Sequence, residues 1–200
     1  MKKISISAAA VFLLLLSFSA LKAQKDYVVK LTGDTVFGKI RKPLLGSLKF
    51  EESDQKDGRN ITLHEYKEYY RSKDSTHYVA VKIKGTKKYE FLERIEYGKL
   101  QLFVKVVSSP GSMGPGGVMT GGNSTSTWYA GFNLDSLLEV KTNGLLGSRL
   151  QREKNFDTLI GTYPELLENF KKEKDFSFAM IRAYVRKFNQ YNKPIKNEVE

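Results

Sequence analysis

The sequence contains few side chains that could carry out catalysis. It has two histidines, His64 and His77, and no cysteine. Thiol nucleophiles, cysteine-ligated zinc and iron–sulfur clusters are therefore excluded. The H-E-x-x-H spacing of zinc proteases and the G-x-S-x-G turn of serine hydrolases are also missing from the sequence. We predict no catalytic residue, no metal site and no cofactor.

Carboxylates offer the main alternative to that prediction. Glycosidases use paired carboxylates, and Glu93 has acidic neighbours three residues away on both sides, although such spacing is common on protein surfaces. Glu93 and Arg94 also directly follow two apolar residues. Opposite charges beside a buried strand either form a structural ion pair or line a site. An envelope enzyme acting on glycan or peptide would have Glu93, His64 or His77 in its site.

A partial nucleotide-binding motif occurs near the start of the chain. Gly33, Gly38 and Lys39 have the spacing that opens a phosphate-binding P-loop. Ile40 stands where a hydroxyl would hold magnesium, and residues 27–40 alternate like strands instead of leading into a helix. We interpret this segment as a β-hairpin, in which Gly33 makes the turn and Gly38 permits a bulge or a close backbone approach.

Residues 1–23 have the layout of a secretory signal peptide. Lysines precede an apolar run, and a small residue, Ala23, ends the segment. The run is shorter than the roughly 20 residues that a membrane-spanning helix needs. We predict cleavage after Ala23, no transmembrane helix in the mature chain, and a location in the periplasm, at the outer membrane or outside the cell. An uncleaved membrane anchor is the alternative, and the lack of cysteine excludes a lipoprotein.

Residues 24–147 are predicted to form an antiparallel β domain. Polar and apolar residues alternate most clearly in 77–84 and 100–106, whereas 64–71 fits either a helix or a strand. Alternation of this kind favours an antiparallel meander over a parallel sheet. We therefore predict an α+β fold, with a largely antiparallel sheet or small open barrel followed by two or three C-terminal helices.

The strand predicted at 100–106 has the strongest pattern. Leu102, Val104 and Val106 are expected to point inward, while Phe103 lies on the other face. A large aromatic residue on that second face indicates that it is partly covered. The next segment, 108–127, is rich in glycine and predicted to be a long loop, either functional or disordered.

Residues 148–192 have helical periodicity and are predicted to pack on the sheet. Residues 162–165 have the spacing of a capping box with proline in the first turn, and Ser177 is a suitable cap for the last helix. The apolar stripe of that helix is expected to be core, with a partner or a membrane as the alternative. Residues 193–200 are predicted to form a frayed tail.

The chain is basic, with a formal net charge of +11. Loss of the three lysines in residues 1–23 would leave about +8, spread along the chain without a block of like charge. This distribution is typical of a solvated surface, with weak contact to an anionic surface as the sharper alternative. Export and the lack of a reader motif argue against nucleic acid.

Three segments resemble a known group of proteins. They are YVVKLTGDTVFGKI at 27–40, FLERIEYGKLQLF at 91–103 and YPELLENF at 163–170. In this order they are similar to an uncharacterised secreted protein family of Bacteroidota, which has GDTxxGKI and FLE…GK motifs and a Pro-Glu-Leu helical end. The glycine-rich loop and Tyr163 depart from the family pattern. The resemblance implies an envelope location and no particular activity.

Together these patterns predict an exported cell-envelope protein that binds or interacts and is not an enzyme. Its partner would be an envelope protein or a glycan. Aromatic residues expected to be exposed, and the charged pair beside them, are the predicted contact residues. They are Tyr97, Phe103, Trp128, Tyr129, Glu93 and Arg94.

Overall fold

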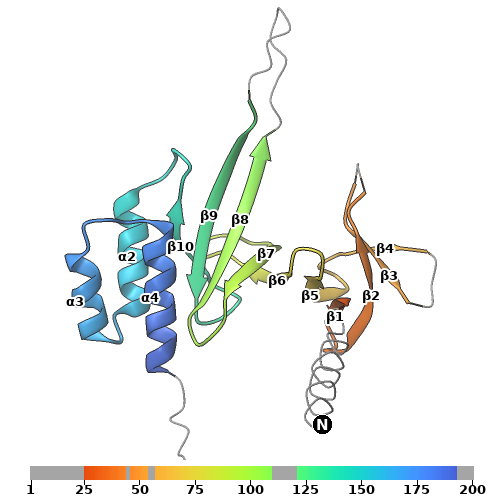
Figure 1. Ribbon diagram of the computed structural model, residues 1–200, viewed down its shortest axis with the longest axis horizontal. Coiled ribbons are helices and arrows are strands. Elements are labelled where there is room, and N and C mark those ends of the chain that lie inside the picture. The colour runs from red at the N-terminus through yellow and green to blue at the C-terminus, as the bar shows by residue number, and fades with distance from the viewer. Residues whose placement is uncertain (1–24, 44–45, 54–56, 110–120, 193–200) are drawn as a thin grey trace, which may run out of the picture.

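The computed structural model describes residues 25–43, 46–53, 57–109 and 121–192 (Figure 1). The predicted signal peptide, the tail at 193–200 and most of the glycine-rich segment lie outside the described residues. Ten strands form one sheet, in the order β10-β9-β8-β7-β6-β5-β1-β2-β3-β4. Their bounds are Asp26–Lys30 (β1), Thr35–Arg41 (β2), Lys49–Glu52 (β3), Arg59–Asn60 (β4), Tyr66–Arg71 (β5), Thr76–Lys82 (β6), Tyr89–Glu96 (β7), Gln101–Ser109 (β8), Asn123–Gly131 (β9) and Leu138–Thr142 (β10).

Three helices follow the sheet: α2 (Arg149–Ile160), α3 (Pro164–Lys172) and α4 (Phe178–Tyr191). Neighbouring strands pair antiparallel. The α+β prediction is therefore confirmed. The helices stand at one end of the molecule and β1 to β4 at the other (Figure 1).

The predicted hairpin at 27–40 is formed by β1 and β2. Gly33 has a φ of +103° in the turn, a conformation that glycine adopts without strain. Gly38 lies so close to β3 that a Cβ atom there would be 2.1 Å from the carbonyl oxygen of Glu51. Both roles predicted for these glycines, a turn and a close backbone approach, are confirmed.

The carboxylate of Asp26 joins β1 to two neighbouring segments. It accepts hydrogen bonds from the backbone N–H of Ile40 at 2.7 Å and from the N–H and hydroxyl of Ser72 at 2.7 and 2.6 Å. Burial raises the pKa of Asp26, but the hydrogen bonds from Ser72 and Ile40 outweigh it and the pKa is lowered. The ionised side chain therefore stabilises the N-terminal part of the sheet.

The middle of the sheet is curled by the connection between β9 and β10. The N–H of Lys82 donates to Leu134 at 2.7 Å, and the N–H of Leu137 donates to Lys82 at 3.0 Å, so that residues 134–137 run beside the end of β6. A compact apolar cluster is enclosed between this connection and β6 to β9. Its buried members are Val79, Val81, Leu92, Phe103, Tyr129 and Leu137.

The helices cover the opposite face of β8 to β10. Leu100 and Leu102 are fully buried there against Phe156 of α2 and Ile181 of α4. Strand β8 is therefore buried on both faces over its first half, as Phe103 indicated. Its second half leaves the body with β9 as a two-stranded arm, and Val106 is 56 % exposed, so its predicted inward position is wrong.

The arm also changes the predicted glycine-rich loop. Strand β8 extends to Ser109 and β9 begins at Asn123, with Ser109 paired to Asn123. The predicted loop at 108–127 was therefore too long at both ends, because serine and threonine side chains at these positions support strand pairing as well as turns.

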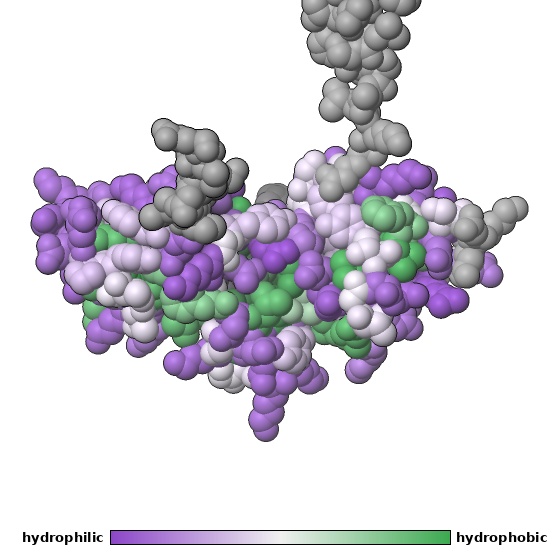
Figure 2. Space-filling model, turned by 90° about the horizontal axis from the view of Figure 1, so that it is seen from below, coloured by the Kyte–Doolittle hydropathy of each residue, from purple (hydrophilic) through white to green (hydrophobic). Residues whose placement is uncertain are grey.

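A third apolar cluster holds the far end of the sheet together. Its buried members are Val28, Phe50, Ile61, Tyr66 and Tyr69. Segment 64–71, which fitted helix or strand, contains β5 and contributes two tyrosines to this cluster. Seen from below, apolar surface lies across the middle of the molecule and is bordered by hydrophilic side chains (Figure 2).

Candidate functional site

A row of cross-strand neighbours brings the chemistry-bearing side chains together. Tyr27 pairs with Tyr70, and Tyr70 pairs with His77. Tyr78 of β6 pairs with Glu93 of β7. The residues adjacent to this pair, His77 and Arg94, therefore lie side by side on the opposite face of the sheet. Aromatic and polar side chains from four strands therefore meet on one face.

His77 is the centre of this polar cluster and is 8 % exposed. Its Nε2 lies 2.8 Å from Oε2 of Glu68, although the ring N–H is not well aligned with that oxygen. Its Nδ1 lies 2.9 Å from Nη2 of Arg94 and 2.8 Å from the hydroxyl of Tyr97. A guanidinium has donors only, so Nδ1 must be the acceptor, and we assign the ring proton to Nε2.

The result is an acid–imidazole–hydroxyl chain, Glu68–His77–Tyr97. Arg94 supports it by placing its guanidinium carbon 4.4 Å from the centre of the Tyr97 ring and by donating to Gln101 at 3.0 Å. The His77 contact lowers the pKa of Glu68, with burial opposing and Arg94 and Lys67 assisting. The carboxylate therefore stays ionised. Nδ1 has a single lone pair and faces both Arg94 and Tyr97, so it can act as the base for the Tyr97 hydroxyl only when Arg94 does not occupy that lone pair.

A separate groove of about 780 Å³ lies between the β1–β2 turn and the curled part of the sheet. This volume falls in the usual range for small-molecule sites, roughly 300–1,000 Å³. Its lining residues are Leu31, Leu63, His64, Lys67, Ala80, Lys87, Lys88, Tyr89, Leu134 and Asp135.

The lining combines aliphatic side chains with cations. Lys67, Lys87 and Lys88 form no ion pair with a carboxylate of the described residues. The single acid in the lining, Asp135, accepts a hydrogen bond from the hydroxyl of Tyr89 at 2.5 Å. The groove therefore offers apolar surface with an excess of positive charge at its edge.

The aromatic residues predicted to be contact residues differ in how far they are exposed. Phe103 is fully buried and Tyr129 is 8 % exposed, so the expectation that they are exposed is wrong. Both belong to the cluster beneath residues 134–137, which lie far away in sequence from Phe103. Trp128 is half-buried with its ring 4.8 Å from that of Phe178 on α4, and Tyr97 is 58 % exposed.

Glu93 and Arg94 point to opposite faces of β7. Arg94 belongs to the polar cluster, whereas Glu93 lies opposite Tyr78, where burial and the nearby Asp74 raise its pKa. His64 lines the groove but Glu93 does not. The two residues that a glycan or peptide enzyme would have combined are therefore not brought together in this groove.

Sequence reasoning missed two members of the polar cluster as partners, Glu68 and Tyr27. Both lie in strands whose register cannot be read from one sequence. It considered Lys87 and Lys88 for contact with an anionic surface but did not join them to Lys67, which comes from a separate segment. The sequence signal for these residues was the predicted alternation along the strands, which places charged side chains at regular positions on one face of each strand.

Comparisons of the chain with protein-family models, with curated proteins and with solved structures found no match. In the part of the chain that the structure describes, no helix is long and apolar enough to cross a membrane. Within the same residues, no three or more histidine and acidic side chains are grouped so that they could hold a metal ion.

Proposed function

We propose that the protein is an exported envelope protein that binds a ligand, and that the ligand is an anion with an apolar body held in the 780 Å³ groove. The observation that carries the proposal is the combination of aliphatic lining with three lysines that form no ion pair with a carboxylate of the described residues. An apolar body would displace water from Leu31, Leu63 and Leu134, while its anionic group would meet the ammonium groups at the edge.

The two halves of such a ligand contribute differently. Each buried methylene contributes about 0.8 kcal/mol, so eight of them would contribute about 6 kcal/mol before the losses of association. Each exposed charge pair with a lysine contributes up to about 1 kcal/mol. The alkyl part therefore supplies most of the affinity, and the lysines select an anion over a neutral molecule. Carboxylate and phosphate heads share this chemistry.

The test measures displacement of anilinonaphthalene sulfonate, an apolar fluorescent anion, by dodecanoate, dodecyl phosphate, dodecanol and acetate. The two long-chain anions should displace the probe, dodecanol should do so more weakly, and acetate should not compete. Reversing two charges in Lys87→Glu with Lys88→Glu should weaken dodecanoate by about tenfold.

Lys154→Glu with Lys172→Glu is the matched control, because it makes the same two charge reversals at exposed residues of α2 and α3. Equal loss in this control and in the groove variant would show a general charge effect and no site. Unchanged binding in the groove variant would place the ligand elsewhere and end the proposal.

A second candidate function is an enzyme that uses Tyr97 to donate and accept a proton. The chain Glu68–His77–Tyr97 favours it, since an oriented imidazole activates a hydroxyl. An aryl sulfonyl fluoride tests the activation: the Tyr97 oxygen would bond to sulfur, fluoride would leave, and His77 would take the proton.

Peptide mapping should find Tyr97 labelled faster than Tyr191, which is similarly exposed at 54 %. The variant His77→Gln should slow Tyr97 labelling by about tenfold or more while leaving Tyr191 unchanged, since general-base assistance contributes at least that factor. Equal labelling of the two tyrosines would remove this candidate.

A further inference from the structure

The connection from β10 to α2 presents two adjacent leucines to solvent. Leu145 is 102 % exposed and Leu146 is 88 % exposed, and Leu150 on the first turn of α2 is 59 % exposed. Single exposed leucines are ordinary on protein surfaces, but a contiguous group of this kind marks an interaction surface.

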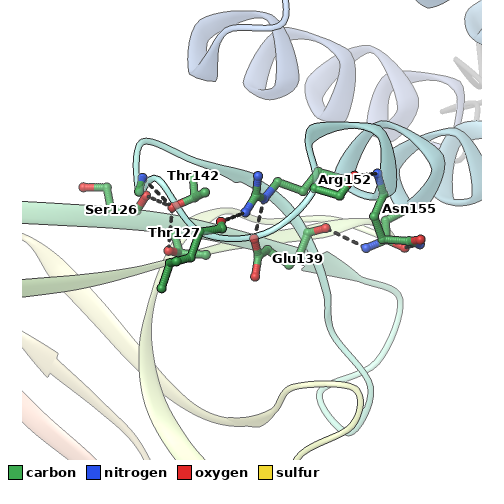
Figure 3. Close-up of polar contacts among 10 residues, drawn as sticks. Ser126, Thr127, Glu139, Thr142, Arg152 and Asn155 are labelled. Carbon is green, nitrogen blue, oxygen red and sulfur yellow. Dashed lines mark hydrogen bonds and ion pairs between the residues drawn. The ribbon is translucent and has the colours of Figure 1, made fainter.

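One end of this connection is fixed by a buried arginine. Arg152 of α2 is 9 % exposed, donates through Nη2 to the carbonyl oxygen of Leu146 at 2.5 Å and through Nε to Glu139 of β10 at 2.5 Å (Figure 3). Gly147 has a φ of +85° and lies so close to Arg152 that a Cβ atom would come within 2.6 Å of Nη2. The backbone that carries Leu146 is therefore anchored to the helix and the strand.

The other end is fixed to β9 and β10. Asn143 accepts a hydrogen bond from the N–H of Ser126 at 2.7 Å, and the hydroxyl of Thr142 accepts one from the N–H of Gly144 at 3.0 Å. The hydroxyls of Thr142 and Thr127 lie 2.9 Å apart in the same network (Figure 3). Hydrogen bonds at both ends thus hold the two leucines in water, where their apolar surface is unfavourable.

Charge around the leucines indicates what covers them. Residues 139–154 contain four cations and two acids, Glu139 and Glu153. Arg152 pairs with Glu139, and Arg149 pairs with Glu153 at 2.7 Å although it is 68 % exposed. The surroundings therefore keep a net positive charge that attracts anions, while the leucines themselves require an apolar phase.

The size of the patch argues for lipid over protein. A stable protein interface needs about 800 Å² on each partner, far more than three leucines supply. Acyl chains can close around protruding side chains without a matching pocket. The β8–β9 arm points to the same side of the molecule in Figure 1, and Val107 of β8 is itself 52 % exposed.

We propose that the connection at residues 143–148 inserts Leu145 and Leu146 into an anionic lipid surface, with Arg149 at the level of the headgroups. The proposal does not depend on the ligand of the groove. It assigns the membrane contact to one loop, in contrast to a diffuse attraction by the overall positive charge.

Cosedimentation with vesicles tests the proposal. The protein should bind vesicles of phosphatidylcholine mixed with phosphatidylglycerol more tightly than vesicles of phosphatidylcholine alone. Leu145→Ser with Leu146→Ser should reduce the partition coefficient about 100-fold, because two buried side chains are lost. Phe37→Ser, at another residue that is 53 % exposed, should bind like the wild type.

A second measurement uses the absence of cysteine from the chain. A single Leu145→Cys carrying the environment-sensitive dye NBD should shift its emission to the blue with mixed vesicles, and Lys154→Cys should not. The groove variant Lys87→Glu with Lys88→Glu should keep most of the vesicle binding of the wild type, so that failure of one proposal can be told from failure of the other.

Three results would overturn the inference. Sedimentation of the wild type that is no greater with anionic than with neutral vesicles would remove the role of the anionic headgroups. Equal binding by the double serine variant would leave only diffuse charge attraction. A wild-type dimer that becomes monomeric in the double variant, with no vesicle binding by either, would assign the leucines to a second copy of the chain.

Discussion

Asn189 of α4 is the residue whose removal should separate the helices from the sheet most specifically. Its Oδ1 accepts a hydrogen bond from the N–H of Leu100 at 2.9 Å. Its Nδ2 donates to the carbonyl oxygens of Leu100 at 2.8 Å and of Tyr97 at 3.1 Å. Leu100 is fully buried, so water cannot readily replace these bonds.

Asn189→Ala removes three hydrogen bonds and leaves both backbone groups of Leu100 without this partner. A typical hydrogen bond contributes about 1 kcal/mol, and a buried group left unpaired costs about 1–3 kcal/mol. We therefore expect the free energy of unfolding to fall by about 3–4 kcal/mol, near the upper end for single substitutions.

Urea unfolding followed by circular dichroism and by Trp128 fluorescence measures this loss. Trp128 is the only tryptophan, and it packs against Phe178 of α4, so its emission reports on the contact between helix and sheet. Gln190→Ala is the matched control, because it removes an exposed amide from the same helix and should change stability by less than about 0.5 kcal/mol. A loss below about 1 kcal/mol in Asn189→Ala, at an unchanged m value, would refute the reasoning.

Three further predictions concern the sheet. Gly38→Ala should lower the free energy of unfolding by about 2 kcal/mol or more in urea unfolding, because the added methyl group meets the carbonyl oxygen of Glu51; wild-type stability would contradict the close approach. Glu68 has a pKa below its usual 4.5, so its stabilisation is complete above that pH and is lost as the pH falls through the folded-state value. Glu68→Gln should flatten the acid side of a stability–pH curve, and an unchanged acid slope would argue against the contact between Glu68 and His77. Asp26→Asn should destabilise by about 1–3 kcal/mol at pH 7 and by less in acid, since the pKa of Asp26 is also lowered, and thermal melts at both pH values would check the difference.

Local patterns were sufficient to predict the elements but not all of their surroundings. The hairpin at 27–40 and the strand at 77–84 could be predicted because alternation and turn glycines are local properties. Ser177 caps α4 as expected, with its hydroxyl accepting from the N–H of Met180 at 3.2 Å. The predicted capping box at 162–165 is wrong, because Tyr163 is the N-cap residue and makes no side-chain capping bond.

The burial of β8 could be predicted only in part. The aromatic side chain at Phe103 indicated a covered face, but what covers it is a connection that ends at Leu137. Tyr129 was expected to be exposed although the connection that covers it follows only a few residues later in the chain. Burial of this type depends on how the sheet curls, which alternation along one strand does not determine.

The candidate sites could be predicted less well than the fold. Arg94 and Tyr97 were selected from the sequence, and both lie in the polar cluster. Their partners Glu68 and His77 come from two other strands, and the pairing of those strands sets the distances. A single sequence shows which side chains are available, whereas the register decides which of them meet.

The parallel contact between residues 134–137 and the end of β6 has a consequence for the order of folding. Segments about fifty positions apart in the chain must meet before the enclosed cluster is sealed, and contacts of such long range form slowly. We expect the amide protons of Lys82 and Lys84, which donate to Leu134 and Leu137, to gain protection late in pulsed hydrogen exchange. A nascent chain that ends before Leu137 would keep Phe103 accessible to chaperones until the rest of the chain has been made.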